Sequence, residues 1–327
     1  RKGTPAQVAF LNPAVQNYRF PAAAQVVAPA SALVSTLGAL LQVAAQQTGQ
    51  PVPAQVAALA AAATPTDTDR AAVSALLAGQ RRALWLGALA MRHSAYADLR
   101  AAAAALAALT GATLGYVPEG ANAAGAAMVG FLPHREAGLR VLPRPGLDSR
   151  AMVESRLKAY VLLGVESADH AAGATGAIAA ADFVVALTPF ASTETLEAAD
   201  VILPIGTFAE TSGTYVNLNG VWQSFTGVAR PVGESRPGWK VLRVLGNLLG
   251  LPGFDYATSE EVRDEARHAA GSDATAVAVA AYAGGHEVAA GEGGMTQDVP
   301  MYGVDALTRR ATALQMTPEA RRGAAVY

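Results

Sequence analysis

Cysteine is missing from this sequence of 327 residues. Without cysteine the chain can form no disulfide, and it offers no thiolate as a nucleophile or as a ligand for zinc or an iron–sulfur cluster. Many kinds of redox and metal site are therefore excluded from this stretch of chain. A location facing the cytosol is compatible with this composition, although the absence of cysteine is permitted in any compartment.

Charged side chains are also scarce. They make up 15% of the residues, whereas soluble domains usually contain about 25%. Hydrophobic residues make up 52%, so the chain can bury a large core and also part of its outer surface against partners. The net charge of −2 gives no electrostatic reason to expect binding to nucleic acid or to an anionic membrane.

The common motifs for phosphate binding and hydrolysis are absent. The glycines after two expected strands, Gly87 and Gly164, do not belong to a GxGxxG sequence, and GxxxxGK[ST] and GxSxG do not occur. Glu166 follows the second of these strands, at the end where doubly wound sheets bind ligands. A carboxylate there would repel a phosphate, and the alternative is a solvated loop charge.

The histidines do not have the spacing of a metal site. We expect them to be scattered solvent-exposed or capping residues: His93, His134, His170, His268 and His286. The sequence therefore predicts no catalytic residue, no cofactor-binding residue and no metal ligand in this chain.

Short apolar runs alternate with helical segments along the chain. The runs expected to form strands are 7–11, 83–87, 112–116, 159–164, 183–187 and 201–203. Continuous apolar strands alternating with helices predict an α/β fold with a mostly parallel sheet covered on both faces. Thr110, Gly111 and Pro118 interrupt the uncharged run 101–118, so we expect a helix, a turn and a strand there, with no insertion into a membrane.

The segment from Phe20 to Thr66 contains no charged residue. We expect a helix around 31–47, a loop at Pro51 and Pro53, and a second alanine-rich helix, all serving as connectors that pack on their neighbours. The sequence allows a break between two lobes near 66–80.

The segment 215–222 predicts a β-hairpin with a type I′ turn at Asn219-Gly220. A helix is expected from Trp239 to Leu251, with Lys240 and Arg243 nearer solvent. Its apolar positions are expected to form a buried stripe: Val241, Leu242, Val244, Leu245, Leu248 and Leu249. Thr258 begins a further helix, and a Gly/Ala-rich tail follows, ending in a segment at 301–315 able to dock.

Polar and aromatic residues before and within the hairpin could suggest chemistry. Glu210 precedes Thr211 and Ser212, but a loop that uses such groups to satisfy its own backbone is far more common than a catalytic set. Trp222 and Phe225 are better explained as packing residues than as a stacking platform. Gly213, Asn219 and Gly220 fit turn geometry.

Three runs carry a likeness to a known family. Residues 199–205 (ADVILPI), 208–217 (FAETSGTYVN) and 219–224 (NGVWQS) resemble the molybdopterin oxidoreductase family. The following run at 230–250 is similar to the large G subunits of bacterial NADH:quinone oxidoreductase, respiratory complex I. Segments 84–90, 119–130, 162–166 and 299–315 resemble the same subunits. At the position before Gln223 the pterin enzymes often have Gly-Arg, whereas this chain has Val221-Trp222, which argues against retained pterin binding.

The resemblance implies a fold and a role. It implies doubly wound sheets of the formate dehydrogenase-like large-subunit type over residues 1–257, followed by a helical C-terminal part over 258–327. It implies a C-terminal fragment that keeps the fold without the cofactor, with the iron–sulfur clusters in an N-terminal region outside this sequence. The implied location is peripheral, on the cytoplasmic side of the bacterial inner membrane, among the other peripheral-arm subunits of complex I.

The expected function is that of a non-catalytic structural segment in a complex that moves electrons from NADH to quinone and pumps protons. The alternative is a fragment of an active molybdopterin-dependent oxidoreductase of the formate dehydrogenase or nitrate reductase type. A binding module with a vestigial nucleotide pocket, at the ends of the strands 159–164 and 183–187, is a further alternative.

Overall fold

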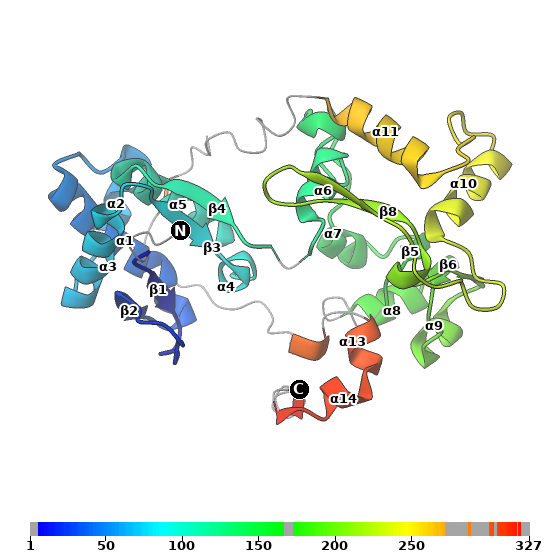
Figure 1. Ribbon diagram of the computed structural model, residues 1–327, viewed down its shortest axis with the longest axis horizontal. Coiled ribbons are helices and arrows are strands. Elements are labelled where there is room, and N and C mark those ends of the chain that lie inside the picture. Colours follow the sequence, from blue (N-terminus) through cyan, green and yellow to red (C-terminus); the bar gives the residue numbers. More distant parts are fainter. Residues whose placement is uncertain are drawn as a thin grey trace. The chain divides into compact units, whose positions relative to one another are not determined.

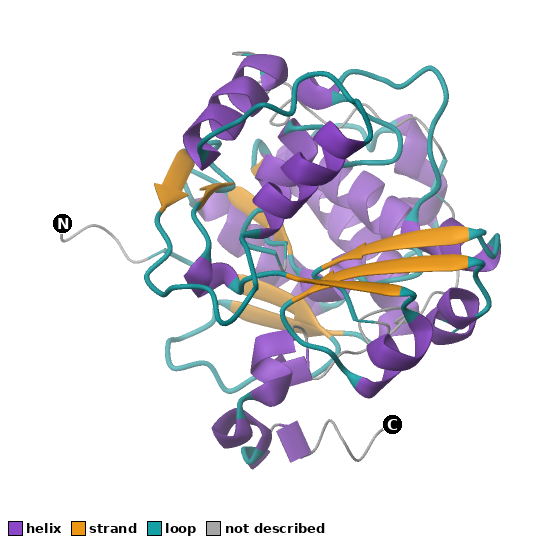
Figure 2. Cartoon of the chain, turned by 90° about the vertical axis from the view of Figure 1, so that its right-hand side faces the viewer, coloured by secondary structure: helices purple, strands orange, loops and turns teal. Residues whose placement is uncertain are grey.

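The computed structural model describes residues 6–118, 120–166, 173–271, 287–288, 301–303, 306–318 and 320–321. The chain divides into two compact units. The first contains Arg1–Glu119 and Ala280–Asp298, and the second contains Gly120–Val279 and Val299–Tyr327. Helices and short strands occur in both units (Figures 1 and 2).

The first unit contains two parallel strand pairs, β1 with β2 and β3 with β4. Its strands are β1 (Ala9–Asn12), β2 (Ala24–Val27), β3 (Ala83–Leu86) and β4 (Thr113–Tyr116). Its helices are α1 (Leu33–Thr48), α2 (Ala57–Ala61), α3 (Asp67–Ala78), α4 (Ala88–Met91) and α5 (Tyr96–Thr110), with short 3-10 helices at Ala30–Ala32 and Ala54–Val56. Strand β2 was not predicted; it lies in the uncharged segment 20–66, for which the sequence predicted two helices and a loop from about residue 31 onward.

The uncharged segment forms the core of the first unit. Helix α1 packs on α5, α2 and α3, and its buried residues run from Leu33 to Ala44. A Cβ added at Gly38 would lie 2.7 Å from the carbonyl oxygen of Leu59, so the glycine permits a close approach of α1 to α2. A helix covered on several sides has no solvent-facing stripe for charges. Residues 66–80 contain α3, which packs on α1 and β2.

The second unit contains a parallel sheet in the order β5-β6-β7 and an antiparallel hairpin, β8-β9. Its strands are β5 (Ala159–Leu163), β6 (Phe183–Thr188), β7 (Val201–Pro204), β8 (Gly213–Val216) and β9 (Trp222–Phe225). Its helices are α6 (Ala123–Met128), α7 (Ser149–Glu154), α8 (Ala174–Ala179), α9 (Thr193–Ala198), α10 (Gly238–Leu248), α11 (Ser259–Ala270), α13 (Ala306–Arg310) and α14 (Thr312–Gln315), with 3-10 helices at Ala137–Leu139, Phe208–Glu210 and Met301–Gly303.

Helices cover one face of the β5-β6-β7 sheet. Leu162 and Val184 point to this face and line a small cavity with residues of α8 and α9. On the other face Val161 and Phe183 are exposed. The α/β fold with parallel strands is confirmed, and the predicted strands all occur within a residue or two of their expected limits. In the part of the chain that the structure describes, the helical cover expected on both faces is found on one.

The hairpin and α10 differ from their predictions. Among residues 217–221, which join β8 to β9, Gly220 alone has a positive φ, of 74°, so the turn is not type I′. Asn217 organises this loop, because its Oδ1 accepts hydrogen bonds from the backbone N–H groups of Asn219 and Val221 at 2.9 and 3.0 Å. Asn122 precedes α6 at the position where an asparagine side chain often caps a helix, but its side chain makes no capping hydrogen bond. Its Oδ1 instead accepts a hydrogen bond from the N–H of Val216 at 2.8 Å and joins α6 to β8.

The apolar stripe expected to be buried on α10 lies largely at the surface. Val244, Leu248 and Leu249 are exposed, and only Gly246 of this helix is buried. A Cβ added at Gly246 would lie 2.3 Å from Cδ1 of Phe254, so the glycine permits a close approach of Phe254 to the helix, while Leu242 and Leu245 are partly buried.

Candidate functional site

The carboxyl ends of the parallel strands β5 and β6 form the candidate site, because ligands of doubly wound sheets bind at this edge. Gly164 follows β5 with φ 62° and turns the chain toward Glu166. The Glu166 side chain is only 7% exposed. A buried carboxylate requires cationic partners or neutralisation, so its neighbours decide what this edge can do.

Two arginines from the C-terminal part of the chain pair with Glu166. Arg309 Nη2 donates a hydrogen bond to Glu166 Oε2 at 2.8 Å, and Arg310 Nη2 lies 2.7 Å from Oε1. The Arg310 guanidinium also lies 4.5 Å from the ring centroid of Phe190, which follows β6. We call Glu166, Phe190, Arg309 and Arg310 the strand-end cluster.

Backbone carbonyls hold the two arginines in place. Arg309 Nη1 donates to the carbonyl of Gly303 at 2.9 Å, and Arg310 Nη1 donates to the carbonyl of Ala306 at 3.0 Å. The guanidinium groups are thus shared between Glu166 and their own segment. The sequence led us to expect docking of the segment 301–315, and it docks here, although the arginines that perform it were not singled out.

The loop after β6 is held by its own side chains. The Thr188 hydroxyl donates to the Phe190 carbonyl at 2.7 Å and accepts from the Phe190 N–H at 3.1 Å. Ser192 caps α9 by accepting from the N–H of Thr195 at 3.2 Å. Hydrogen bonds from its own backbone N–H and from the Ser192 hydroxyl hold the pKa of Glu194 below its ordinary value, and the charge of Arg310 acts in the same direction.

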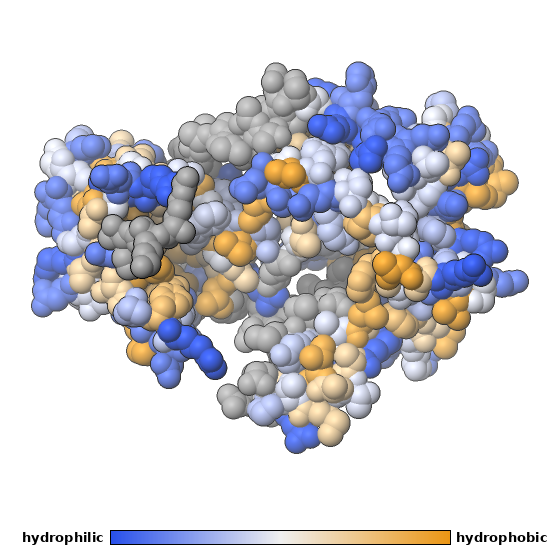
Figure 3. All heavy atoms as spheres, in the orientation of Figure 1, coloured by the Kyte–Doolittle hydropathy of each residue, from blue (hydrophilic) through white to orange (hydrophobic). Residues whose placement is uncertain are grey.

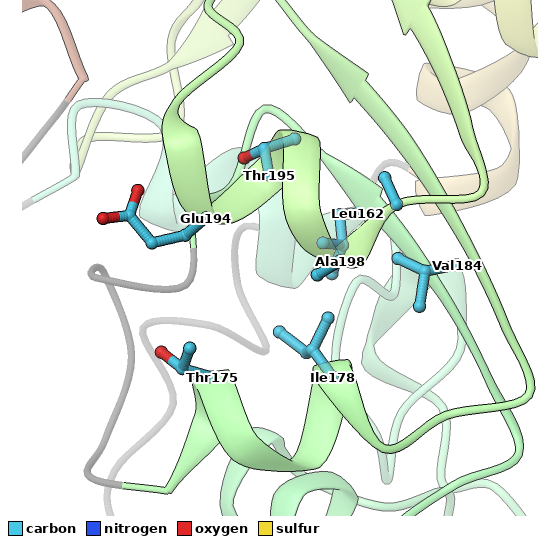
Figure 4. Close-up of a pocket in the computed structure, with 8 residues that line it drawn as sticks. Leu162, Thr175, Ile178, Val184, Glu194, Thr195 and Ala198 are labelled. Carbon is cyan, nitrogen blue, oxygen red and sulfur yellow. The ribbon is translucent and has the colours of Figure 1, made fainter.

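A small cavity lies between the sheet and the helices α8 and α9. Its volume is about 10 Å³, close to the space that one water molecule needs. Figure 4 shows Thr175 and Ile178 of α8 pointing toward α9. The Glu194 carboxylate points away from the apolar lining residues Leu162, Val184 and Ala198. The cavity is a packing gap of this layer and is too small for an organic ligand.

The other residues considered from the sequence have structural partners. Glu210 Oε2 accepts from the N–H and the hydroxyl of Thr207 at 2.7 and 3.0 Å, and Ser212 accepts from the N–H of Gly227. Trp222 packs against a small hydrophobic cluster of three buried residues, Met128, Val216 and Ala270. Phe225 meets the Tyr215 ring edge-on at 5.0 Å between centroids.

The histidines do not converge. His93 is 3% exposed, its Nε2 bonds to the Ala30 carbonyl at 2.8 Å and its Nδ1 accepts from the Ala95 N–H at 3.0 Å. His134 and His268 are exposed, and His170 and His286 lie outside the described residues. Within the described ranges there is no group of three or more His, Asp or Glu side chains arranged to hold a metal ion.

Comparisons with known proteins agree on a family. The sequence pattern of the family described as Molybdopterin oxidoreductase matches residues 43–248, more than half of the chain. A putative formate dehydrogenase of Staphylococcus aureus strain bovine RF122 is 30% identical over 138 residues, which are 40% of this chain and 14% of that protein. Its counterpart in strain USA300 is 29% identical over the same length. The chain spans about a seventh of the length of these relatives.

In the part of the chain that the structure describes, no helix combines the length and the hydrophobicity needed to cross a membrane.

Proposed function

Because this chain belongs to the molybdopterin oxidoreductase family, we propose that it is a non-catalytic structural segment of a large oxidoreductase subunit. The subunit type that we propose is the G subunit of proton-pumping NADH:quinone oxidoreductase. In that role the segment contributes folded mass and contact surface, while electrons move through cofactors held elsewhere in the complex.

The strand-end cluster carries this proposal. Ligands of doubly wound sheets bind at the carboxyl ends of the strands, and here Arg309 and Arg310 from the same chain pair with Glu166 at that edge. These ion pairs occupy the strand ends with side chains of the chain itself. We propose that they hold the C-terminal helices α13 and α14 against the sheet.

The family name implies a molybdopterin, and the residues at the ends of the β5-β6-β7 sheet do not fit one. The cavity beside this sheet measures about 10 Å³, whereas pockets for organic ligands measure about 300–1,000 Å³. Glu166 is buried and paired with arginines of its own chain. We therefore derive no catalytic step from this edge.

A second candidate is a fragment of an active molybdopterin-dependent oxidoreductase. The reported relatives favour it over the first candidate, because both are putative formate dehydrogenases. In that case the pterin would be held by parts of the protein other than the β5-β6-β7 edge.

The first candidate also entails a setting for the chain. Its partners would be other peripheral-arm subunits, its location would be the cytoplasmic side of the bacterial inner membrane, and iron–sulfur clusters would be bound by a cysteine-containing region outside this sequence. The absence of cysteine within the 327 residues supports the proposal that this segment binds no iron–sulfur cluster and that another region does.

The test is to purify the native assembly that contains this chain and to measure two activities on the same sample. We expect NADH-dependent quinone reduction, no formate-dependent dye reduction, and molybdenum well below one atom per chain by elemental analysis. Formate-dependent activity together with stoichiometric molybdenum and a fluorescent pterin oxidation product would overturn the first candidate and support the second.

A matched pair of variants separates a structural role from a catalytic one. Glu166→Gln is expected to reduce the amount of assembled complex while the turnover of each assembled complex stays unchanged. Glu197→Gln, which removes an exposed carboxylate from α9, is expected to change neither. A fall in turnover at constant assembly for Glu166→Gln would contradict the structural role.

A further inference from the structure

A groove of about 320 Å³ lies beside α10 in the second unit, well separated in sequence from the strand-end cluster. The residue before the helix, Arg236, forms one end of its lining. The first two turns of α10 and the loop that precedes α11 form the rest, with Trp239 and Tyr256 as its aromatic members.

The lining is positively charged and contains no acidic residue. Arg236, Lys240 and Arg243 contribute to it, and no carboxylate in the described ranges forms an ion pair with any of the three. Lys240 Nζ lies 5.3 Å from the Trp239 ring centroid. The Nε of Arg243 is buried and has no hydrogen-bond partner. A buried donor without a partner costs free energy, and an anionic group entering the groove would relieve that cost.

An apolar row continues from the groove along the outside of α10. Val241 and Val244 line the groove, and Leu248 follows them at the i, i+3, i+7 spacing that places residues on one helix face. Leu248 is 80% exposed, and Leu249 beside it is 65% exposed. Figure 3 shows hydrophobic side chains at the surface in the region of α10. Exposed apolar rows bordered by charge are typical of protein-binding surfaces.

Three contacts hold the walls of the groove in place. Residues Ile205 and Arg236 form a parallel β-bridge, which fixes the start of the groove to the end of β7. The Phe254 ring lies on the backbone of Gly246, which fixes the loop carrying Tyr256 against α10. The Tyr256 hydroxyl donates to Glu265 Oε2 at 2.7 Å and so ties that wall to α11.

From this geometry we infer that the groove and the adjoining row on α10 bind an acidic amphipathic helix of another protein. The apolar face of that helix covers Val244 and Leu248, and its carboxylates meet Lys240 and Arg243. This inference concerns a surface different from the strand-end cluster and does not depend on the proposed function.

Charge and shape together select this occupant. A planar guanidinium accepts a carboxylate through two parallel hydrogen bonds, and a helix laid along a groove buries residues at the i, i+3, i+4 and i+7 positions. A small anion would satisfy Arg243 but would leave Leu248 and Leu249 exposed. A neutral apolar helix would cover the leucines but would bring no carboxylate to the three cations.

The test uses the full chain and two fluorescently labelled synthetic peptides of about 18 residues, long enough to form a helix in water. One carries leucines at helical i, i+3, i+4 and i+7 spacing flanked by glutamates, and the other has lysine at each glutamate position. Fluorescence anisotropy at low salt is expected to show binding of the glutamate peptide at least about tenfold tighter than binding of the lysine peptide.

Charge reversal is the sharpest arm of the test. The Lys240→Glu, Arg243→Glu double variant is expected to bind the glutamate peptide about tenfold more weakly than the unchanged chain does, and to bind the lysine peptide more tightly. The control is Arg144→Glu, Arg150→Glu, which changes the net charge equally at two exposed positions. An equal loss in this control would overturn the inference, because binding would then follow net charge alone.

A second pair of variants keeps the inference testable if the charge-reversed chain fails to fold. Leu248→Ser is expected to weaken the glutamate peptide about fivefold, and Leu196→Ser, at an exposed leucine of α9, is expected to have no effect. Absence of binding at millimolar peptide would overturn the inference. Displacement of the peptide by millimolar inorganic phosphate, with no effect of Leu248→Ser, would also overturn it and would identify a small-anion site.

Discussion

Neutralising Glu166 tests whether the strand-end cluster holds the C-terminal helices on the sheet. The Glu166→Gln substitution keeps the size of the side chain and removes its charge. Arg309 and Arg310 would then face an amide whose N–H groups cannot accept a hydrogen bond. Two cations would remain at a partly buried position without an anion, which is the arrangement that makes a broken buried ion pair costly.

The magnitude follows from the burial of the three side chains. Removing one partner from a fully buried pair costs about 3–5 kcal/mol. Here the Glu166 side chain is 7% exposed, but the Arg309 and Arg310 side chains are 21% and 35% exposed. Water partly solvates both guanidinium groups after the change and screens the lost attraction. We therefore expect a cost of about 2 kcal/mol, or a change of about 30-fold in the docking equilibrium.

Hydrogen exchange is the assay that resolves this effect. Helices α13 and α14 contribute little to the buried core, so they can detach while the β5-β6-β7 sheet stays folded. Amide hydrogens of α13 are expected to exchange about 30-fold faster in Glu166→Gln, with unchanged exchange in β6. Glu197→Gln is the matched control at an exposed carboxylate. Equal exchange in the two variants would show that the cluster does not hold the segment.

Replacing the whole cluster gives an independent check. A variant with methionine at Glu166, Arg309 and Arg310 removes all three charges and keeps apolar bulk. Buried ion pairs replaced entirely by apolar residues are often as stable as the original pair, so protection of α13 is expected to recover toward the wild-type value. Slower exchange than in Glu166→Gln would assign the cost to unpaired charge, and equally fast exchange would refute the electrostatic reasoning.

Three further predictions concern the rest of the chain. Gly213→Val is expected to destabilise the hairpin by about 1–3 kcal/mol in urea unfolding, because a Cβ there would lie 2.9 Å from the Phe225 ring; unchanged stability would contradict that contact. His93→Ala is expected to cost about 2–4 kcal/mol, measured in the same way, since the buried ring makes two backbone hydrogen bonds. Hydrogen bonds from the Thr207 N–H and hydroxyl hold the pKa of Glu210 below its ordinary value. They stabilise the fold above the ordinary pKa of the carboxyl, and this stabilisation is lost as the pH falls through the lowered folded-state pKa. Glu210→Gln is therefore expected to flatten the acid limb of the stability–pH curve.

Local sequence rules located most elements of this fold. Apolar runs such as Phe183–Thr188 could be predicted as strands because parallel strands are continuous hydrophobic segments. The Thr258 and Glu261 capping box fixed the start of α11 for the same kind of local reason, since both hydrogen bonds lie within four residues. Strand β2 escaped prediction because AQVV, with alanine on both sides, has no pattern that separates a strand from a helix.

The candidate site could be predicted only in part, because its members are far apart in the sequence. The position of Glu166 after a parallel strand predicted that it would lie at a ligand-binding edge. Its partners Arg309 and Arg310 lie 143 and 144 residues further along the chain, and no local spacing rule connects them. Asn122 illustrates the same limit. Its sequence context predicts a helix cap, yet its side chain bonds to Val216, 94 residues away.

The error at α10 shows how far hydrophobic periodicity can support an inference. The spacing of Val241, Val244 and Leu248 correctly predicts that these residues share one helix face. It does not predict which molecule covers that face. Within the chain, a single glycine, Gly246, lets Phe254 pack against the helix backbone, so the apolar row is left outside. An apolar helix face that the described residues of its own chain leave exposed, beside cations that no carboxylate neutralises, is therefore evidence for a partner rather than for a core.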